Sequence, residues 1–162
     1  MSICIYPGSF DPFTNGHLDL LIRASKIFDQ VIVGVLINSD KKGFFTTQER
    51  KEFITLSAKE AGIENFAVET FNGLTIDFAK EQSAHIIIRG LRAVTDFEYE
   101  LQIAATNKKL APDIETMFLM TNTLYSYLSS SIVKEIATYG GCIAGLVPDV
   151  TRNTIAERLL KK

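Results

Sequence analysis

The chain has 162 residues and a mass of 18.0 kDa, which predicts one domain spanning residues 1–162. Apolar residues make up 46% and charged residues 22% of it, a balance that excludes intrinsic disorder, a collagen-like fibre and a coiled coil. With 17 Lys and Arg against 19 Asp and Glu, no overall positive charge attracts nucleic acid, and we expect no nucleic-acid partner. Any site for an anion must therefore be local.

The cysteines and the hydropathy exclude further classes. Cys4 and Cys142 are far apart in apolar surroundings and form no Cys-x-x-Cys pair, so we expect buried free thiols and neither a zinc site nor a disulfide framework. No basic region precedes the short apolar run at the N-terminus, and no apolar stretch approaches the ~18 residues that a membrane span requires. We expect a soluble, cytoplasmic protein without a membrane partner.

Five short runs rich in apolar and β-branched residues predict strands. In chain order they are residues 3–6, 31–37, 66–70, 86–88 and 116–120. Segments with a helical period separate them, and the first two have faces formed by Leu18, Leu21, Ile22 and Ser25, and by Phe53, Ile54, Ser57 and Ala61. Thr46 and Glu49 have the spacing of a capping box, which predicts where the second helix begins.

Strands that alternate with helices predict an α/β fold. Parallel neighbours need a helix to return the chain, so we expect a Rossmann-like parallel sheet of about five strands flanked by helices. The segment from Pro148 to Lys162 is expected to form a closing C-terminal helix. In such sheets a ligand binds beyond the carboxyl ends of the strands, so the loops that follow the strands are where a site is expected.

The first of these loops, Tyr6 to His17, combines glycine, hydroxyl and imidazole groups. The chain contains neither a Walker A motif nor the G-x-G-x-x-G fingerprint, so a nucleotide must be held in another way. Gly8 lets the backbone approach a ligand closely, and Ser9 adds a hydroxyl. His17 lies in the first turn of a helix, where it either donates to a bound phosphate or caps its own loop. For Asp11 we favour a turn-forming role over a metal ligand.

Cationic side chains follow the second and fourth strands. Lys41 and Lys42 are either solvated surface lysines or supply a mobile charge to a phosphate. Arg89 and Arg92 leave one strand end around Gly90, where guanidinium groups can bind phosphate bidentately, although two solvent-facing arginines are the alternative.

The next helix and the last loop add two more candidates. Glu100 lies beside an apolar stripe that includes Phe97 and Leu101, and either a structural pair with an arginine or a ligand contact fits this position. Three serines at residues 129–131 precede another helix. They suit either the binding of a polyphosphate or a helix N-cap with more hydroxyls than one cap requires. His85 precedes a strand and is expected to be a surface residue.

Together these motifs closely resemble the bacterial phosphopantetheine adenylyltransferase family of the nucleotidyltransferase superfamily. Tyr6 to Pro12 with Thr14-x-Gly16-His17 resembles the superfamily signature. The stretch from Ile88 to Glu100 and the serine triplet resemble blocks of the narrower family. The chain departs from the family pattern at Tyr125, Leu128 and Thr75, where Trp, Ile and Met are frequent.

The resemblance implies adenylyl transfer from ATP to 4'-phosphopantetheine, with Mg²⁺ on the phosphates, no covalent intermediate and no named protein metal ligand. It implies His17 as a transition-state stabiliser, with Lys41 and Arg92 also catalytic. The residues implied to bind phosphopantetheine are Ser9, Lys41, Leu74, Thr75 and Arg89. Those implied to bind ATP are Ser9, Phe10, His17, Gly90, Leu91, Arg92, Glu100, Tyr125, Ser126, Tyr127, Leu128, Ser129, Ser130 and Ser131.

The same resemblance implies a homohexamer, dephospho-coenzyme A as product and coenzyme A as product or feedback ligand. Two alternatives stay open. One is another adenylyl- or cytidylyltransferase of the superfamily, against which the arginine block argues. The other is a nucleotide-binding regulator that keeps the fold and lacks the chemistry.

Overall fold

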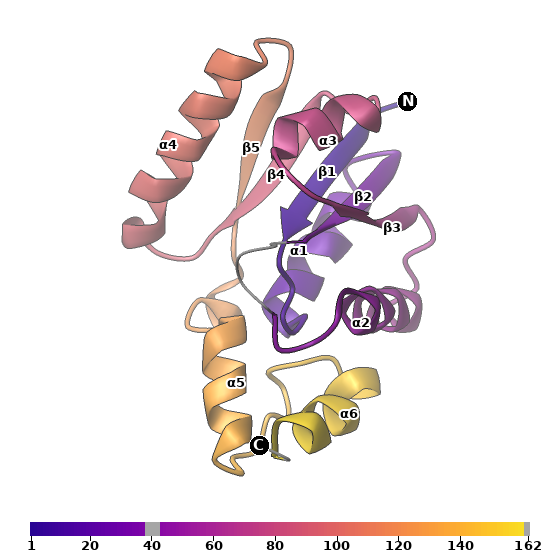
Figure 1. The fold of residues 1–162 in the computed structure, drawn as a ribbon, viewed down its shortest axis with the longest axis vertical. Coiled ribbons are helices and arrows are strands. Elements are labelled where there is room, and N and C mark those ends of the chain that lie inside the picture. Colours follow the sequence, from indigo (N-terminus) through magenta and orange to yellow (C-terminus); the bar gives the residue numbers. More distant parts are fainter. Residues whose placement is uncertain (38–42, 161–162) are drawn as a thin grey trace.

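A parallel β-sheet organises the molecule (Figure 1). The computed structural model describes residues 1–37 and 43–160, and within them five strands pair in the order β3-β2-β1-β4-β5. The strands are β1 (Ile3–Gly8), β2 (Gln30–Leu36), β3 (Phe66–Phe71), β4 (Ile86–Leu91) and β5 (Glu115–Met120), and every pairing is parallel. The predicted α/β fold and all five predicted strands are confirmed.

Helices connect and follow the strands. They are α1 (Asn15–Ser25), α2 (Thr47–Glu60), α3 (Thr75–Glu81), α4 (Val94–Leu110), α5 (Ser130–Thr138) and α6 (Asp149–Leu160), with a short 3-10 helix η1 (Thr123–Tyr125). α6 is the predicted closing helix. The predicted capping box begins α2, because Thr46 Oγ1 accepts from Glu49 N at 3.2 Å and Glu49 Oε2 accepts from Thr46 N at 2.8 Å. None of the helices in the described ranges is long and apolar enough to cross a membrane.

The two faces of the sheet support separate clusters of buried side chains. In β1, Cys4 and Tyr6 pack into the larger cluster with side chains from α1, α2, α5 and α6. Ile5, on the opposite face of the same strand, packs into the smaller cluster with Ile76 and Phe78 of α3. Because side chains alternate along a strand, the apolar run of β1 supplies both layers.

Two details differ from the sequence prediction. β4 continues three residues beyond Ile88, because residues 89–91 go on pairing with β5, so Arg89 and Gly90 belong to the strand and do not leave it. In α1, Leu20, Leu21 and Ala24 are the buried residues, while Leu18 and Ile22 are only partly buried. The buried face of α1 is therefore rotated from the predicted one, and Leu20 packs against Gly90 of β4. A side chain at position 90 would collide with Leu20, because its Cβ would lie 2.5 Å from Leu20 Cδ1.

The thiols differ from each other in their surroundings. Cys4 is buried in β1, and burial raises the pKa of its thiol to about 12. Cys142 is exposed, so the prediction of a buried thiol was right for the first cysteine and wrong for the second. The reason is that Cys142 follows Gly140 and Gly141, which end α5 in a surface turn.

The strand order places a crevice beside β1. The chain runs outward from β1 to β2 and β3, then returns to place β4 on the other side of β1. Loops leaving the carboxyl ends of β1 and β4 therefore diverge, and such a reversal is where open α/β sheets bind ligands.

Candidate active site

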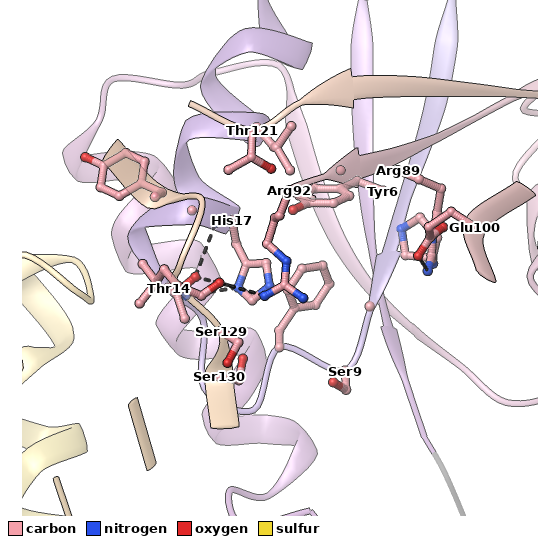
Figure 2. Close-up of a pocket in the computed structure, with 18 residues that line it drawn as sticks. Tyr6, Ser9, Thr14, His17, Arg89, Arg92, Glu100, Thr121, Ser129 and Ser130 are labelled. Atoms are coloured by element: carbon pink, nitrogen blue, oxygen red, sulfur yellow. Dashed lines mark hydrogen bonds and ion pairs between the residues drawn. The ribbon is translucent and has the colours of Figure 1, made fainter. Parts of the chain in front are cut away.

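A cavity of about 320 Å³ lies at this reversal point (Figure 2). Its walls come from β1 and the following loop, from α1, from β4 with Arg92, from α4, and from the segment between β5 and α5. The lining residues are Tyr6, Pro7, Gly8, Ser9, Phe10, Thr14, Gly16, His17, Leu20, Arg89, Gly90, Arg92, Glu100, Thr121, Tyr125, Leu128, Ser129 and Ser130.

Most of the residues singled out in the sequence meet in this cavity. Those that line it are Gly8, Ser9, Phe10, His17, Arg89, Gly90, Arg92, Glu100, Tyr125, Leu128, Ser129 and Ser130. Lys41, with its neighbour Lys42, lies outside the residues that the structure describes. The cavity thus gathers hydroxyl, imidazole and guanidinium groups from four separate parts of the chain.

Other predicted site residues do not line the cavity. Leu91 is buried in β4, and Ser131 and Tyr127 are exposed. The Ser126 hydroxyl donates to the Thr123 carbonyl at 3.0 Å. Leu74 and Thr75 lie where α3 begins, after the edge strand β3. Their binding roles remain predictions.

The cavity also contains residues to which the sequence analysis gave no role. Tyr6 lies within the quoted motif, and burial raises the pKa of its phenol above the ordinary value. Leu20 lines the wall from α1, and Thr121 directly follows β5. Thr121 could have been found from its place, because a polar residue at a strand's carboxyl end is a candidate in any parallel sheet.

His17 is fixed by the helix cap at the start of α1. The backbone N–H of Thr14 donates to His17 Nδ1 at 3.0 Å, and the Thr14 hydroxyl accepts from the backbone N–H of His17 at 3.3 Å. Phe10 and Phe13 pack against the imidazole with ring centroids 5.1 and 5.6 Å away. Because Nδ1 accepts a hydrogen bond, the neutral ring carries its proton on Nε2.

The surroundings of His17 keep it neutral. Burial, and then the charge of Arg92, lower the pKa of His17 from 6.5 to about 4. Figure 2 shows the two side chains close together at the centre of the cavity. Near neutral pH, His17 is therefore a neutral donor through Nε2 beside a permanent cation, and both groups favour an anion in the cavity.

Arg89 and Glu100 form a bidentate ion pair at one wall. Arg89 Nε and Nη2 each donate to a Glu100 carboxylate oxygen at 2.7 Å. Burial lowers the pKa of Arg89, but the hydrogen bonds and charge of Glu100 outweigh that effect and raise it. Of the two interpretations left open for Glu100, the structure shows the pairing with arginine. Within residues 1–37 and 43–160, Arg89 Nη1 has no hydrogen-bond partner.

Arg92 lies beyond the end of β4, near the start of α4. Its Nη1 donates to the Leu128 carbonyl at 2.8 Å, and its Nε donates to Asp96 at 3.3 Å. These contacts join β4 to the segment before α5. They hold the guanidinium beside His17, with its remaining donors available to a ligand.

Two serines at the start of α5 have structural partners. The Ser129 hydroxyl accepts from Ile132 N at 3.2 Å and caps the helix. The Ser130 hydroxyl donates to the Pro12 carbonyl at 2.7 Å. The helix-cap interpretation therefore holds for Ser129, whereas Ser130 joins α5 to the first loop.

Asp11 joins distant parts of the chain. Its carboxylate accepts from Phe44 N and Phe45 N, both at 2.8 Å, and pairs with Lys134 Nζ at 3.4 Å. Asp11 and Pro12 lie in a turn, as predicted, but the Asp11 carboxylate bonds to partners more than 30 residues away. Within the described ranges, no group of three or more His, Cys, Asp or Glu side chains is arranged to hold a metal ion.

Comparison with known proteins decides the family. Residues 5–136 match the model of the cytidylyltransferase-like family. A phosphopantetheine adenylyltransferase of Clostridium tetani is 56% identical over 162 residues, covering 100% of this chain and 98% of the relative. One from Clostridium botulinum (strain Eklund 17B) is 60% identical over 158 residues, covering 98% of each.

The chain belongs to the phosphopantetheine adenylyltransferase family. Solved structures of more distant proteins share the fold of this family. A nicotinic acid mononucleotide adenylyltransferase of Plasmodium falciparum, in complex with NaAD, superimposes with a TM-score of 0.73 at 16% identity, covering 99% of this chain and 95% of the other. A putative nicotinate-nucleotide adenylyltransferase of Vibrio parahaemolyticus gives 0.70 at 16% identity, covering 99% and 93%.

The lowered pKa of His17 predicts a pH-dependent stability. The folded protein binds the His17 proton only near pH 4, whereas the unfolded chain binds it near 6.5. The stabilisation from neutral His17 is therefore present above pH 6.5 and is lost as the pH falls toward 4.

We expect His17→Gln to lose less stability than the wild type between pH 7 and pH 5, by about 1–2 kcal/mol. Urea unfolding of the ligand-free proteins at equal concentration measures the difference. Equal losses in the two proteins would contradict the assignment of a neutral, buried His17.

Proposed function

We propose that the chain transfers the adenylyl group of ATP to the phosphate of 4'-phosphopantetheine, giving dephospho-coenzyme A and pyrophosphate. The reaction is reversible and belongs to coenzyme A biosynthesis. The observation that carries the proposal is the full-length identity of 56% and 60% to relatives with this name, joined to a cationic cavity at the reversal point of the sheet.

The chemistry needs positioning and charge neutralisation more than a reactive side chain. The acceptor is a phosphate monoester whose oxygen is largely ionised near neutral pH, so it attacks without a strong general base. The oxygen approaches the α-phosphorus in line with the departing pyrophosphate. Two polyanions must meet, and groups that neutralise their charge in a preorganised site lower the barrier.

We assign His17 the stabilising role in this step. Its Nε2–H donates to the α-phosphoryl group, and the bond strengthens as charge builds up in the transition state. The low pKa supports this assignment, because a neutral imidazole keeps one donor fixed and does not titrate near pH 7. Arg92 lies beside it in the cavity, and Arg89 is held there by Glu100. We assign Arg92 to the same phosphates and Arg89 to the acceptor phosphate.

The remaining predicted contacts are part of this proposal. Ser9 lies between the two phosphates, and Lys41 belongs to the acceptor side with Leu74 and Thr75. The backbone and side chains around Gly90 and residues 125–131 hold the nucleotide. The position of Tyr125, Leu128 and Ser129 in the cavity lining supports the nucleotide assignment.

Mg²⁺ is the expected cofactor, and the cavity fits an ion that arrives with the nucleotide. Glu100 is the acidic residue among the described lining residues, and both of its oxygens accept from Arg89. Phosphate oxygens and water, which are the ligands that Mg²⁺ commonly keeps, would therefore supply most of its coordination. When bound, the ion neutralises phosphate charge.

An assembly of six copies, expected from the resemblance, is also proposed. α4 has no buried residue, although it carries Phe97, Tyr99 and Leu101, which are 44%, 65% and 49% exposed. The predicted apolar stripe therefore lies open in the single chain. Met117 and Met120 of the neighbouring edge strand β5 are also exposed, and a second copy would cover apolar side chains of this kind. Regulation by coenzyme A and a cytoplasmic location belong to the same proposal.

Pyrophosphate release tests the function. Purified protein with Mg²⁺, ATP and 4'-phosphopantetheine should release pyrophosphate, and mixtures with CTP as donor or nicotinamide mononucleotide as acceptor should not. Pyrophosphate release with another donor and acceptor would instead assign the chain a different substrate of the nucleotidyltransferase superfamily. Ligand-induced stabilisation without release would favour the regulatory binder.

The same assay tests the role of His17. We expect His17→Ala to lower kcat by roughly 10²-fold or more with little change in ATP affinity, because one transition-state donor is lost. His85→Ala is the matched control, since His85 is the chain's other histidine and is exposed outside the cavity. A wild-type rate for the His17 variant would contradict the assignment.

Sedimentation tests the assembly. We expect a particle of six times the 18.0 kDa chain mass. Leu101→Lys on α4 should reduce that mass, whereas Leu56→Lys, at a 39% exposed leucine of α2, should not. A monomer at micromolar concentration, or equal effects of both variants, would contradict the proposed interface.

A further inference from the structure

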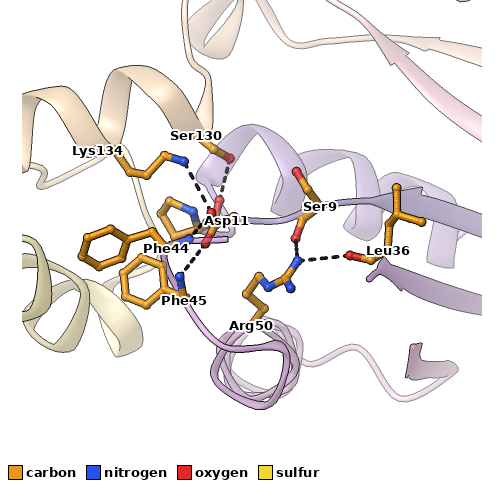
Figure 3. A network of polar contacts seen from close by, with 9 residues as sticks. Ser9, Asp11, Leu36, Phe44, Phe45, Arg50, Ser130 and Lys134 are labelled. Atoms are coloured by element: carbon orange, nitrogen blue, oxygen red, sulfur yellow. Dashed lines mark hydrogen bonds and ion pairs between the residues drawn. The ribbon is translucent and has the colours of Figure 1, made fainter. Parts of the chain in front are cut away.

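Arg50 of α2 is a buried cation that contacts the first loop behind the cavity. Its side chain is only 6% exposed. Nη1 donates to the Ser9 carbonyl at 2.7 Å and to the Leu36 carbonyl at 3.3 Å (Figure 3). Nη2 donates to Thr47 Oγ1 at 3.2 Å. One side chain thus links α2 to the residue that follows β1 and to the last residue of β2.

The charge of Arg50 has no acidic partner in the described ranges. Arg89, Arg92 and Lys134 pair with Glu100, Asp96 and Asp11, whereas no carboxylate of residues 1–37 or 43–160 lies within 4.0 Å of the Arg50 guanidinium. Its buried Nε also lacks a hydrogen-bond partner there. Burying an unpaired charge is costly, and a long apolar side chain would fill the space at lower cost. Packing alone therefore does not account for an arginine.

The hydrogen bond to Ser9 sets the direction of one peptide group. A trans peptide is planar, and its C=O and N–H point in opposite directions. The Ser9 carbonyl points toward Arg50, which is not part of the cavity lining, whereas Ser9 and Phe10 are. The Phe10 N–H therefore points to the cavity side, and it makes no hydrogen bond within the described residues.

The backbone at Phe10 would favour the opposite orientation. Its φ is 49°, in the left-handed region that residues other than glycine rarely adopt. Turning the Ser9–Phe10 peptide over would bring φ of Phe10 to the common negative side, with the N–H directed away from the cavity. The contact from Arg50 opposes this turn, because the Ser9 carbonyl would lose its buried donor.

We propose that Arg50 is a positioning residue that holds the Ser9–Phe10 peptide with its N–H facing the cavity, as a donor to a phosphoryl oxygen. The inference rests on the proposed function, since that function supplies the phosphates. Arg50 itself touches no substrate. It acts through a backbone group next to His17, whose ring packs edge-on against Phe10.

A single NMR signal reports on this peptide. Ser9–Phe10 is the only Ser–Phe pair in the sequence, so protein made by cell-free synthesis with carbonyl-¹³C serine and ¹⁵N phenylalanine gives one carbonyl-linked amide signal. Adding inorganic pyrophosphate or ATP to the wild type should move the Phe10 amide proton downfield. An unchanged amide signal at saturating pyrophosphate would overturn the proposal without any variant.

Arg50→Met then removes the donor and keeps a long side chain. We expect the Ser9 carbonyl signal to move, the amide response to pyrophosphate to be lost, and kcat to fall by about 10- to 100-fold, as for a misplaced or missing donor. Arg50→Lys, which keeps a donor and the charge, should lose less on each measure and replaces the Met variant if that protein does not fold.

Arg23→Met is the matched control. Arg23 of α1 also donates to a carbonyl at the end of a strand, Met120 at 2.7 Å, but it does not line the cavity or contact the first loop. Its variant should keep the amide response and kcat even where it lowers the melting temperature.

The outcomes separate the two proposals. A folded Arg50 variant that keeps both the wild-type kcat and the amide response would overturn the positioning role. If the wild-type amide responds to pyrophosphate and Arg50→Met abolishes the response, positioning is supported even where ATP and phosphopantetheine give no product. That last result would contradict only the proposed reaction.

Discussion

The cavity depends on the fixed course of the loop between β1 and α1, and that course depends on buried polar anchors at both of its sides. The Asp11 carboxylate binds the backbone of Phe44 and Phe45 and pairs with Lys134 of α5. Thr14 is the N-cap of α1, and its backbone N–H also orients the His17 ring. Burying a charged or polar group without its hydrogen-bond partners costs free energy. These contacts therefore leave the loop little freedom to move. Chain segments far apart in sequence are thus held to one loop geometry.

The ion pairs around the cavity also fix the geometry of the site. Arg89 is held by Glu100 and Arg92 by Asp96 and the Leu128 carbonyl, so both guanidinium groups are oriented before any ligand arrives. Donors that are already in place need not reorganise as charge moves in the transition state, which is where preorganised sites gain most of their effect. Neutral His17 among these cations offers an N–H donor at Nε2 without adding charge.

Local patterns in the sequence predict much of this arrangement. Alternating apolar strands and helical periods indicate the parallel sheet, and the rule that ligands bind at the carboxyl ends directs attention to Ser9, His17, Arg89 and Arg92. The partners of individual side chains are harder to predict from the sequence. Asp11 beside Pro12 has the local pattern of a turn, and only the fold brings Phe44 and Lys134 to it. Arg50 lies within an ordinary polar helix, and nothing in its spacing indicates that it reaches Ser9.

The stripe of Phe97 and Leu101 shows a further limit. A helical period predicts which residues share a face, but it cannot tell whether that face packs on the chain's own sheet or on another copy. In the structure α4 contacts β4 and β5 and leaves both side chains about half exposed. The periodicity correctly predicted a helix here, and the assembly proposed above would cover its exposed side chains.

In the proposed reaction, a preorganised cavity aligns two phosphates for direct transfer, without a covalent enzyme intermediate. The stereochemistry at the transferred phosphorus tests it most directly. With ATP that carries a single chiral sulfur substitution at the α-phosphorus, one in-line displacement inverts the configuration in the dephospho-coenzyme A product. We expect inversion. Retention would require two displacements and an adenylylated side chain, and would contradict it.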